Sequence, residues 1–309
     1  MNGPKPPSPG VRPPSPAARV SLALLVILAW AACFVVIKGS LEQAPPLFYA
    51  ALRALVAGVP LLGIAVACGR LRPPKGAWGW LAALGFGNTF LGFAGMFLSV
   101  GEVGAAIPGV LANTQALLVA PFACLFFGEE LTGWKVIGLA VGLAGVTLTA
   151  AHGAMGLGRI EGALFALLAA AGVAGGSLII KQIGFRVDFL TATAWQYVLG
   201  SLPLLAWALA AEDLRGITWR PGFVLGLLFL GLVGSAGASL LWYLLVTWGE
   251  LIRLTAFTFL TPVFAVLLAT LVFREGLRPI GVLGVSLSIA GVACVVWSEP
   301  GRTPRGVGT

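Results

Sequence analysis

The side chains that could do covalent or metal chemistry in this 309-residue chain are few and lie far apart. The one histidine, His152, stands in a glycine-rich stretch, and Cys33, Cys68, Cys124 and Cys294 lie in apolar stretches without Cys-x-x-Cys spacing. All eleven acidic residues fall in expected loops or helix ends. Metal sites and catalytic centres need such groups in clusters, and no nucleotide-binding glycine motif is present. The sequence therefore predicts no catalytic residue, no metal site and no cofactor.

Polar and aromatic side chains within apolar segments are better suited to binding a small molecule. Buried polar groups need partners, and because serine and threonine can bond to their own helix, the amides of Asn113, Gln115 and Gln196 weigh most. Tryptophan and tyrosine could stack on a ring or an apolar part of a solute. The candidates are Asn88, Thr89, Asn113, Thr114, Gln115, Gln196, Ser235, Ser239, Thr258 and Thr261, with the aromatic residues Trp30, Trp195, Trp242 and Tyr243.

Three basic residues are candidates for a gate or a coupling group. Arg53 lies about six residues, or roughly 9 Å, into an expected helix, and a charge inside a membrane is a functional candidate. It could equally extend to the interface toward Glu42. Lys38 and Lys181 stand at helix ends. Each can be an anchor whose side chain reaches the membrane interface, or a gate residue.

The composition indicates that these residues are positioned by helices in a lipid bilayer. Hydrophobic residues make up 59% of the chain, charged residues 10%, and the mean hydropathy is +0.99. About 20 apolar residues form a helix that crosses the hydrocarbon core. Ten such segments predict an all-α membrane protein: 19–38, 47–68, 77–98, 103–127, 134–151, 160–181, 189–211, 221–245, 250–273 and 279–297.

The basic residues fit a membrane protein better than a nucleic-acid-binding protein. The net charge is +8, but the lysines and arginines are scattered between hydrophobic segments and form no stripe. Most of them face the cytoplasm if the N-terminus does. We therefore expect a cytoplasmic (inner) membrane protein with both termini inside, lipid contacts and no nucleic-acid partner; the oligomeric state stays open.

An internal repeat divides the chain into two halves. Residues 127–146, FGEELTGWKVIGLAVGLAGV, return as FREGLRPIGVLGVSLSIAGV at 273–292, and one common offset pairs Lys38 with Lys181 and Arg53 with Gln196. Because five crossings reverse direction, the second half lies inverted, a construction used by secondary transporters. We predict two inverted five-helix repeats, 19–151 and 160–297. A disordered, proline-rich cytoplasmic tail at 1–18 precedes them, and a tail at 298–309 follows.

The two copies resemble the EamA-type ten-helix transporters of the drug/metabolite transporter superfamily. The motif residues are FLTPVFAVLLATLVFREGLRPIGVLGVSLSIAGV at 259–292 and NTQALLVAPFACLFFGEELTGWKVIGLAVGLAGV at 113–146. The first copy has Ala116 where Pro262 stands, so the bend that the proline makes is expected at Pro108 or Pro121. Glu129 and Glu275 match across the copies. One reading of these residues is a gate or coupling carboxylate, but we expect Glu129 to cap a helix or to pair with Lys135.

The resemblance implies a central substrate cavity lined by the first, third, fourth, sixth, eighth and ninth helices. This favours as cavity residues Trp30, Asn88, Asn113, Gln115, Trp242 and Thr258. Gln196 is added because an amide buried in an apolar segment needs a polar partner. It also implies alternating-access export of amino acids or related amphipathic solutes. Because no acidic residue is expected at mid-membrane, either a helix-end group such as Glu102 or Glu250 couples transport to protons, or the protein is a uniporter or an exchanger.

Two other classes of function remain open at this point. A membrane enzyme acting on lipid would need a cluster of His, Asp, Glu or Cys at one membrane face, which the sequence does not indicate. A scaffold or sensor would keep the repeat without transport. Uniformly filled helix packing would favour the scaffold, and polar residues lining a continuous cavity would favour the transporter.

Overall fold

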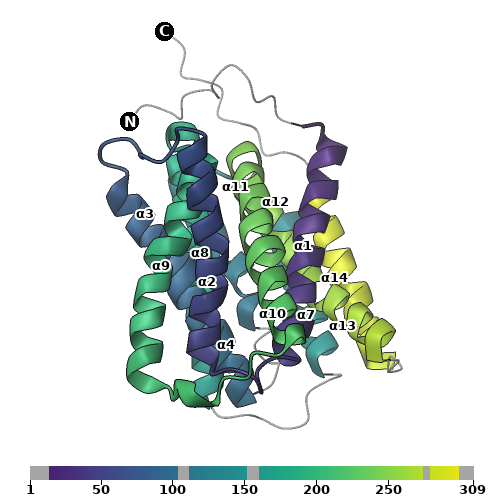
Figure 1. Cartoon of the computed structure of the whole chain (residues 1–309). Helices are drawn as coiled ribbons and strands as arrows, with labels where there is room; N and C mark the ends of the chain where they lie inside the picture. The colour runs from purple at the N-terminus through teal and green to yellow at the C-terminus, as the bar shows by residue number, and fades with distance from the viewer. Residues whose placement is uncertain (1–13, 104–110, 152–159, 274–278, 299–309) are drawn as a thin grey trace.

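A computed structural model describes residues 14–103, 111–151, 160–273 and 279–298, and this part of the chain is a bundle of helices (Figure 1). Within these described residues, seven continuous helical stretches are long and apolar enough to cross a membrane by length and composition. The predicted ten-helix, all-α membrane fold is confirmed. The first half comprises α1 (Pro16–Lys38), α2 (Pro46–Ala67), α3 (Trp78–Leu84), η1 (Gly85–Leu91), α4 (Gly92–Val103), α6 (Gln115–Phe127) and α7 (Gly133–Ala151).

The second half repeats this order of elements. It comprises α8 (Ile160–Ile183), α9 (Phe189–Ala211), α10 (Pro221–Leu228), η4 (Phe229–Gly237), α11 (Ala238–Trp248), α12 (Leu251–Ala256), η5 (Phe257–Phe259), α13 (Leu260–Phe273) and α14 (Pro279–Trp297). Prolines open several of these helices, where the missing N–H would have no intrahelical acceptor. Asp188 starts α9, because its carboxylate accepts from the backbone N–H groups of Leu190 and Thr191 at 3.2 Å.

The halves pack against each other through equivalent helices. The second helix of each half forms one pair, α2 with α9, and the fifth helix of each half forms another, α7 with α14. Among the other contacts, α4 packs on α8, while α1 packs on α11 and α13. The start of α1 and the end of α14 lie at one end of the bundle, called here the Pro16 end, and α1 finishes at the opposite, Lys38 end (Figure 1).

Small residues allow α7 and α14 to approach closely. A Cβ on Gly138 would lie 2.6 Å from Cγ2 of Val295 and 2.7 Å from the carbonyl oxygen of Gly291. A Cβ on Gly145 would lie 2.7 Å from the carbonyl oxygen of Gly284. In lipid, such contacts between small residues are a main source of helix association. The α7–α14 pair therefore forms a tightly packed edge of the bundle.

The third helix of each half changes its winding at the same place. The expected helix 77–98 runs as α3, η1 and α4 to Val103, and η1 is π-helical. Its counterpart, η4, is also π-helical and lies between α10 and α11. Both segments are rich in glycine, GFGNTFL and FLGLVGSAG. Such wide turns within α-helices are frequent at functional sites.

The fourth helix of each half is interrupted, which corrects the continuous helices expected at 103–127 and 250–273. In the first half a turn at Asn113 and Thr114 precedes α6. The Thr114 hydroxyl donates to the carbonyl oxygen of Leu111 at 2.6 Å and so competes with helical bonding. In the second half η5 is a 3₁₀ turn, and Pro262 can supply no N–H to the carbonyl of Thr258.

The interruption that the structure describes in the first half, at Asn113 and Thr114, contains no proline. Pro121 lies within α6, beyond the turn at Asn113 and Thr114. Pro108, the other expected position, lies outside the described residues. The two halves therefore share an interruption but produce it with different residues.

Candidate functional site

A polar bridge joins the two halves at the first π-helical segment. Asn88 lies in η1, and its side-chain nitrogen donates to Oε1 of Gln196 on α9 at 3.4 Å. Gln196 is buried. Asn88 also lies against Gly176 of α8, where an added Cβ would lie 2.7 Å from the Asn88 Cβ. The structure thus brings together two of the predicted binding residues.

An aromatic pair lies beside this bridge. The ring centroids of Trp30 and Trp242 are 5.1 Å apart, and the planes of the two rings are tilted by 54°. Trp242 is buried. The indole N–H of Trp242 donates to the Ser177 hydroxyl at 3.4 Å. Ser177 follows Gly176 in α8, so the aromatic pair and the amide bridge contact consecutive residues of the same helix. We call Trp30, Asn88, Gln196 and Trp242 the central cluster.

Three further predicted binding residues, Asn113, Gln115 and Thr258, lie at the interruptions of the fourth helices. Asn113 is buried in the turn, and Gln115, half-buried, begins α6. Thr258 is buried in η5, where its hydroxyl donates to the carbonyl oxygen of Thr255 at 2.7 Å. The hydroxyl of Thr258 is therefore satisfied within its own helix.

A second polar bridge connects the halves through Arg53. This side chain of α2 is buried and points inward, and its Nε donates to the Ser235 hydroxyl of η4 at 2.8 Å. Nη2 lies 3.7 Å from the Cys33 sulfur, and the guanidinium carbon lies 4.5 Å from the centre of the Phe93 ring. The alternative orientation, toward Glu42 at the interface, is not adopted.

The two bridges occupy equivalent places in the repeat. Arg53 and Gln196 correspond in the second helices, and each bonds to the π-helical segment of the other half, at Ser235 and Asn88 respectively. The pattern differs in charge, because one bridge contains a guanidinium and the other two neutral amides. The offset of the repeat predicts the correspondence between Arg53 and Gln196, whereas their partners follow from packing.

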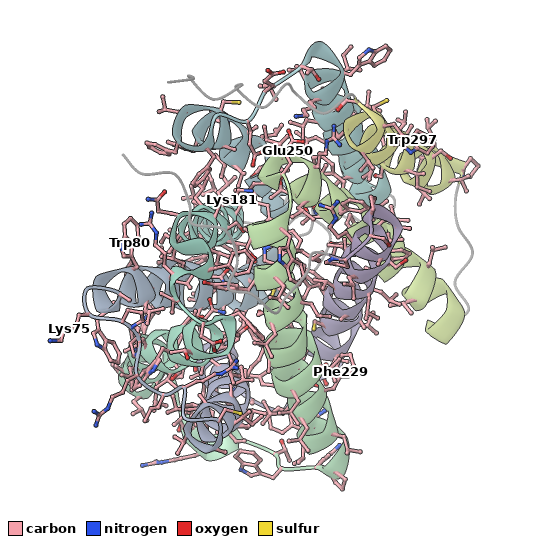
Figure 2. The ribbon with its side chains drawn as sticks, turned by 90° about the horizontal axis from the view of Figure 1, so that it is seen from above. Lys75, Trp80, Lys181, Phe229, Glu250 and Trp297 are labelled. Carbon is pink, nitrogen blue, oxygen red and sulfur yellow. The ribbon has the colours of Figure 1, made fainter. Side chains whose placement is uncertain are left out.

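A cluster of charged side chains links the halves at the Pro16 end. Lys135 is buried; its Nζ donates to the carbonyl oxygen of Glu130 at 2.6 Å and pairs with Glu250. Nε of Arg253 lies 2.8 Å from the second carboxylate oxygen of Glu250. Seen along the bundle from this end, the labelled Glu250 and Lys181 lie toward the middle (Figure 2). Glu250 thus bridges two cations.

Glu129 forms the second part of this cluster. Its carboxylate accepts from the backbone N–H groups of Leu251 and Ile252, at 2.6 and 2.9 Å, and so caps α12. Nζ of Lys181 lies 3.6 Å from the same carboxylate and also bonds to the Gly249 carbonyl. The expected cap is confirmed, but the cation paired with Glu129 is Lys181 and not Lys135.

The opposite end has a similar contact between the halves. Glu212, just after α9, accepts from the backbone N–H groups of Leu47 and Phe48 at 2.7 and 2.8 Å and caps α2. Lys38, the remaining gate candidate, ends α1 at this side, and its side chain lies outside the described residues. A carboxylate of one half therefore caps a helix of the other half at each end.

The structure adds contacts that the sequence analysis missed. Phe93, Ser177 and Glu212 were not predicted site residues, and Glu250 was considered for coupling alone. The signals for two of them were weak: Phe93 is one of 18 phenylalanines, and Ser177 lies in a run of small residues. Glu212 follows an apolar segment, as Glu129 does, and this shared position was the available clue.

Comparison with known proteins gives matches over nearly the whole chain. A model described as the EamA-like transporter family matches residues 18–151 and 160–297. An uncharacterized transporter of Bacillus subtilis is 28% identical over 295 residues, 96% of each chain. An uncharacterized transporter of Synechocystis is 32% identical over 286 residues, 85% of each chain.

Another relative and a solved structure complete the comparison. A protein of Escherichia coli named as a probable amino-acid metabolite efflux pump is 26% identical over 303 residues, 93% of this chain and 98% of that protein. A crystal structure with 21% sequence identity superposes with a TM-score of 0.78, covering 91% of this chain and 96% of that one. At this identity the superposition is evidence of a shared fold.

Proposed function

The chain belongs to the EamA-like transporter family, and from this premise we propose that it exports amino acids or related amphipathic solutes by alternating access. A multi-pass membrane transporter implies a small-molecule substrate. The finer assignment is supported by the distant relatives named as probable amino-acid metabolite efflux pumps. A relative in Escherichia coli named as an inner membrane transporter supports the cytoplasmic membrane as its location. The distribution of lysine and arginine along the sequence supports placing the Pro16 end on the cytoplasmic side.

The observation that carries this proposal is the pair of polar bridges between the halves. Arg53–Ser235 and Gln196–Asn88 lie where the third helices are π-helical, next to the Trp30–Trp242 pair. Transporters built from inverted repeats bind their substrate between the repeats, at interrupted helices. We therefore assign the central cluster to substrate binding: amide groups for the polar part of the solute and two indoles for its apolar part.

The charged cluster at the Pro16 end is proposed as the gate closed in this conformation. Glu129 and Lys135 belong to the first half, while Lys181, Glu250 and Arg253 belong to the second. Separating the halves at this end breaks these contacts. Tighter binding of the solute to the open conformation must offset the free energy that is lost with them. Lys181 is a gate residue in this assignment. Glu212 and its cap on α2 hold the corresponding contact at the Lys38 end.

The test is counterflow into proteoliposomes of the purified full chain. Vesicles loaded with a mixture of unlabelled L-amino acids are expected to accumulate the labelled mixture at least several-fold above protein-free vesicles. Repeating the assay with an imposed proton gradient distinguishes exchange from proton coupling. A correctly inserted, folded protein that gives no flux of any amino acid would contradict the proposed substrate class and favour a non-transporting scaffold.

A further inference from the structure

The guanidinium of Arg53 is buried, and none of the described residues is an anionic partner for it. The side chain is 3% exposed, and Nη1 has no hydrogen-bond partner among the residues that the structure describes, although solvent does not reach it. Nε bonds to a hydroxyl, Nη2 to a thiol, and the guanidinium lies over an aromatic ring. The ion pairs in the described part of the chain are Arg70–Asp188, Lys135–Glu250, Lys181–Glu129 and Arg253–Glu250, and Arg53 enters none of them.

Burying the Arg53 charge without an anionic partner among the described residues costs the folded protein free energy. Burial of an ionised group is tolerated when it is paired and hydrogen-bonded, and an unsatisfied charged nitrogen carries a large desolvation penalty. Ser235 and Phe93 offset part of this penalty, since cation–π contacts and neutral hydrogen bonds are favourable. They supply no negative charge. Structural pairing inside the bundle therefore does not account for a guanidinium at this position.

The equivalent bridge in the other half is a built-in comparison. Gln196 stands where Arg53 stands and connects α9 to η1 through Asn88 with no charge at all. A neutral amide thus suffices to join a second helix to a π-helical segment. The positive charge of Arg53 exceeds what that connection requires, so it is available for a ligand.

The free edge of the guanidinium indicates the chemistry of that ligand. Nη1 is unpartnered and Nη2 is held by a weak thiol acceptor, so the two terminal nitrogens can donate in parallel to a carboxylate. A phosphate dianion would leave one charge uncompensated at a single arginine. Tyr197, next to Gln196 in α9, contacts the same Phe93 ring, with centroids 6.0 Å apart, and so connects the Arg53 region with the central cluster.

We propose that Arg53 binds the carboxylate of the transported solute, which makes this a transporter of organic carboxylates, amino acids included. The inference rests on the proposed function and names the charged group that its substrate must have. In this conformation Arg53 is closed off from solvent; the carboxylate reaches it when either end of the bundle opens. The central cluster then contacts the remainder of the solute.

The experiment compares carboxylates with their neutral amides in the wild-type protein. Counterflow of a labelled mixture of L-amino acids is inhibited with increasing amounts of the unlabelled mixture or of the corresponding L-amino acid amides. Because hydrogen bonds to charged groups are worth about 1.5–3 kcal/mol, the amides should be roughly tenfold or more weaker inhibitors. Equal inhibition by acids and amides would overturn the Arg53 assignment while leaving amino-acid transport intact.

A variant locates this selectivity at Arg53. Arg53→Gln copies the neutral residue of the equivalent bridge. Its preference for carboxylates over amides, measured by the same inhibition of counterflow, is expected to fall at least tenfold. Arg72→Gln, which removes an exposed arginine, should keep the wild-type preference. An unchanged preference in Arg53→Gln would overturn the inference. If that variant does not fold, the wild-type acid–amide comparison decides alone, and no wild-type flux would contradict the proposed function and this inference together.

Discussion

Gln196→Leu is expected to lower counterflow roughly tenfold to 100-fold. Gln196 is 2% exposed, and its Oε1 accepts from Asn88 across the boundary between the halves. Leucine fills a similar volume but leaves the Asn88 amide without this acceptor and removes an amide from the central cluster. Loss of a buried hydrogen bond costs about 1–3 kcal/mol, and about 1.4 kcal/mol is tenfold in an equilibrium constant.

The control for this prediction is Thr147→Val. Thr147 bonds to the Leu143 carbonyl of its own helix and is exposed, so its removal should leave flux within about twofold of wild type. Initial counterflow rates at equal amounts of inserted protein are the measurement. Counterflow at the wild-type rate in Gln196→Leu would show that the central cluster takes no part in transport.

Glu250→Gln is expected to open the Pro16 end. Glu250 pairs with the fully buried Lys135 and with Arg253, and the substitution leaves Lys135 with a carbonyl acceptor from Glu130. Removing one partner of a fully buried ion pair costs about 3–5 kcal/mol. Because Glu250 is partly exposed, we expect the closed conformation to lose a smaller amount, about 2 kcal/mol. This corresponds to a roughly 30-fold shift toward the open conformation.

Thiol modification measures this shift. In a protein whose native cysteines are replaced, Val246→Cys places a thiol at a position that is 0% exposed beside the Lys181 contact. Its rate of alkylation should rise at least tenfold when Glu250→Gln is added. Glu161→Gln, an exposed carboxylate at the start of α8, is the control and should leave the rate unchanged. A rate unaffected by Glu250→Gln would mean that the charged cluster does not hold the gate.

The repeat made most of the architecture predictable from sequence. Two matching copies with five apolar segments each indicate inverted halves, and their offset places Arg53 opposite Gln196 before any contact is known. The irregular helices were not predictable in the same way. A π-helical segment such as η1 changes no hydropathy pattern, and the turn at Asn113 depends on local side-chain bonding that competes with the helix.

The partners of the charged residues were the hardest part to foresee. Lys135 and Glu129 are close in sequence, and a pair between them was one of the two expectations, beside a helix cap. Instead, Lys135 pairs with Glu250 and Glu129 pairs with Lys181, both across the boundary. Such contacts depend on how the two halves dock. The spacing of residues along the sequence does not show this docking. Arg53 is similar: its depth in the helix marked it as a candidate, but its inward orientation follows from packing against η4.

The most direct test of alternating access measures distances at both ends of the full chain in lipid, with the four native cysteines replaced and a cysteine introduced at each labelled position. One pair of spin labels, at Glu130 and Arg186, spans the halves beside the charged cluster; a second pair, at Glu42 and Arg220, spans them at the Lys38 end, and all four side chains are exposed. The account predicts that adding transported L-amino acids shifts the two distance distributions in opposite directions, one lengthening as the other shortens. Distributions that move together, or that do not respond to solute, would contradict it.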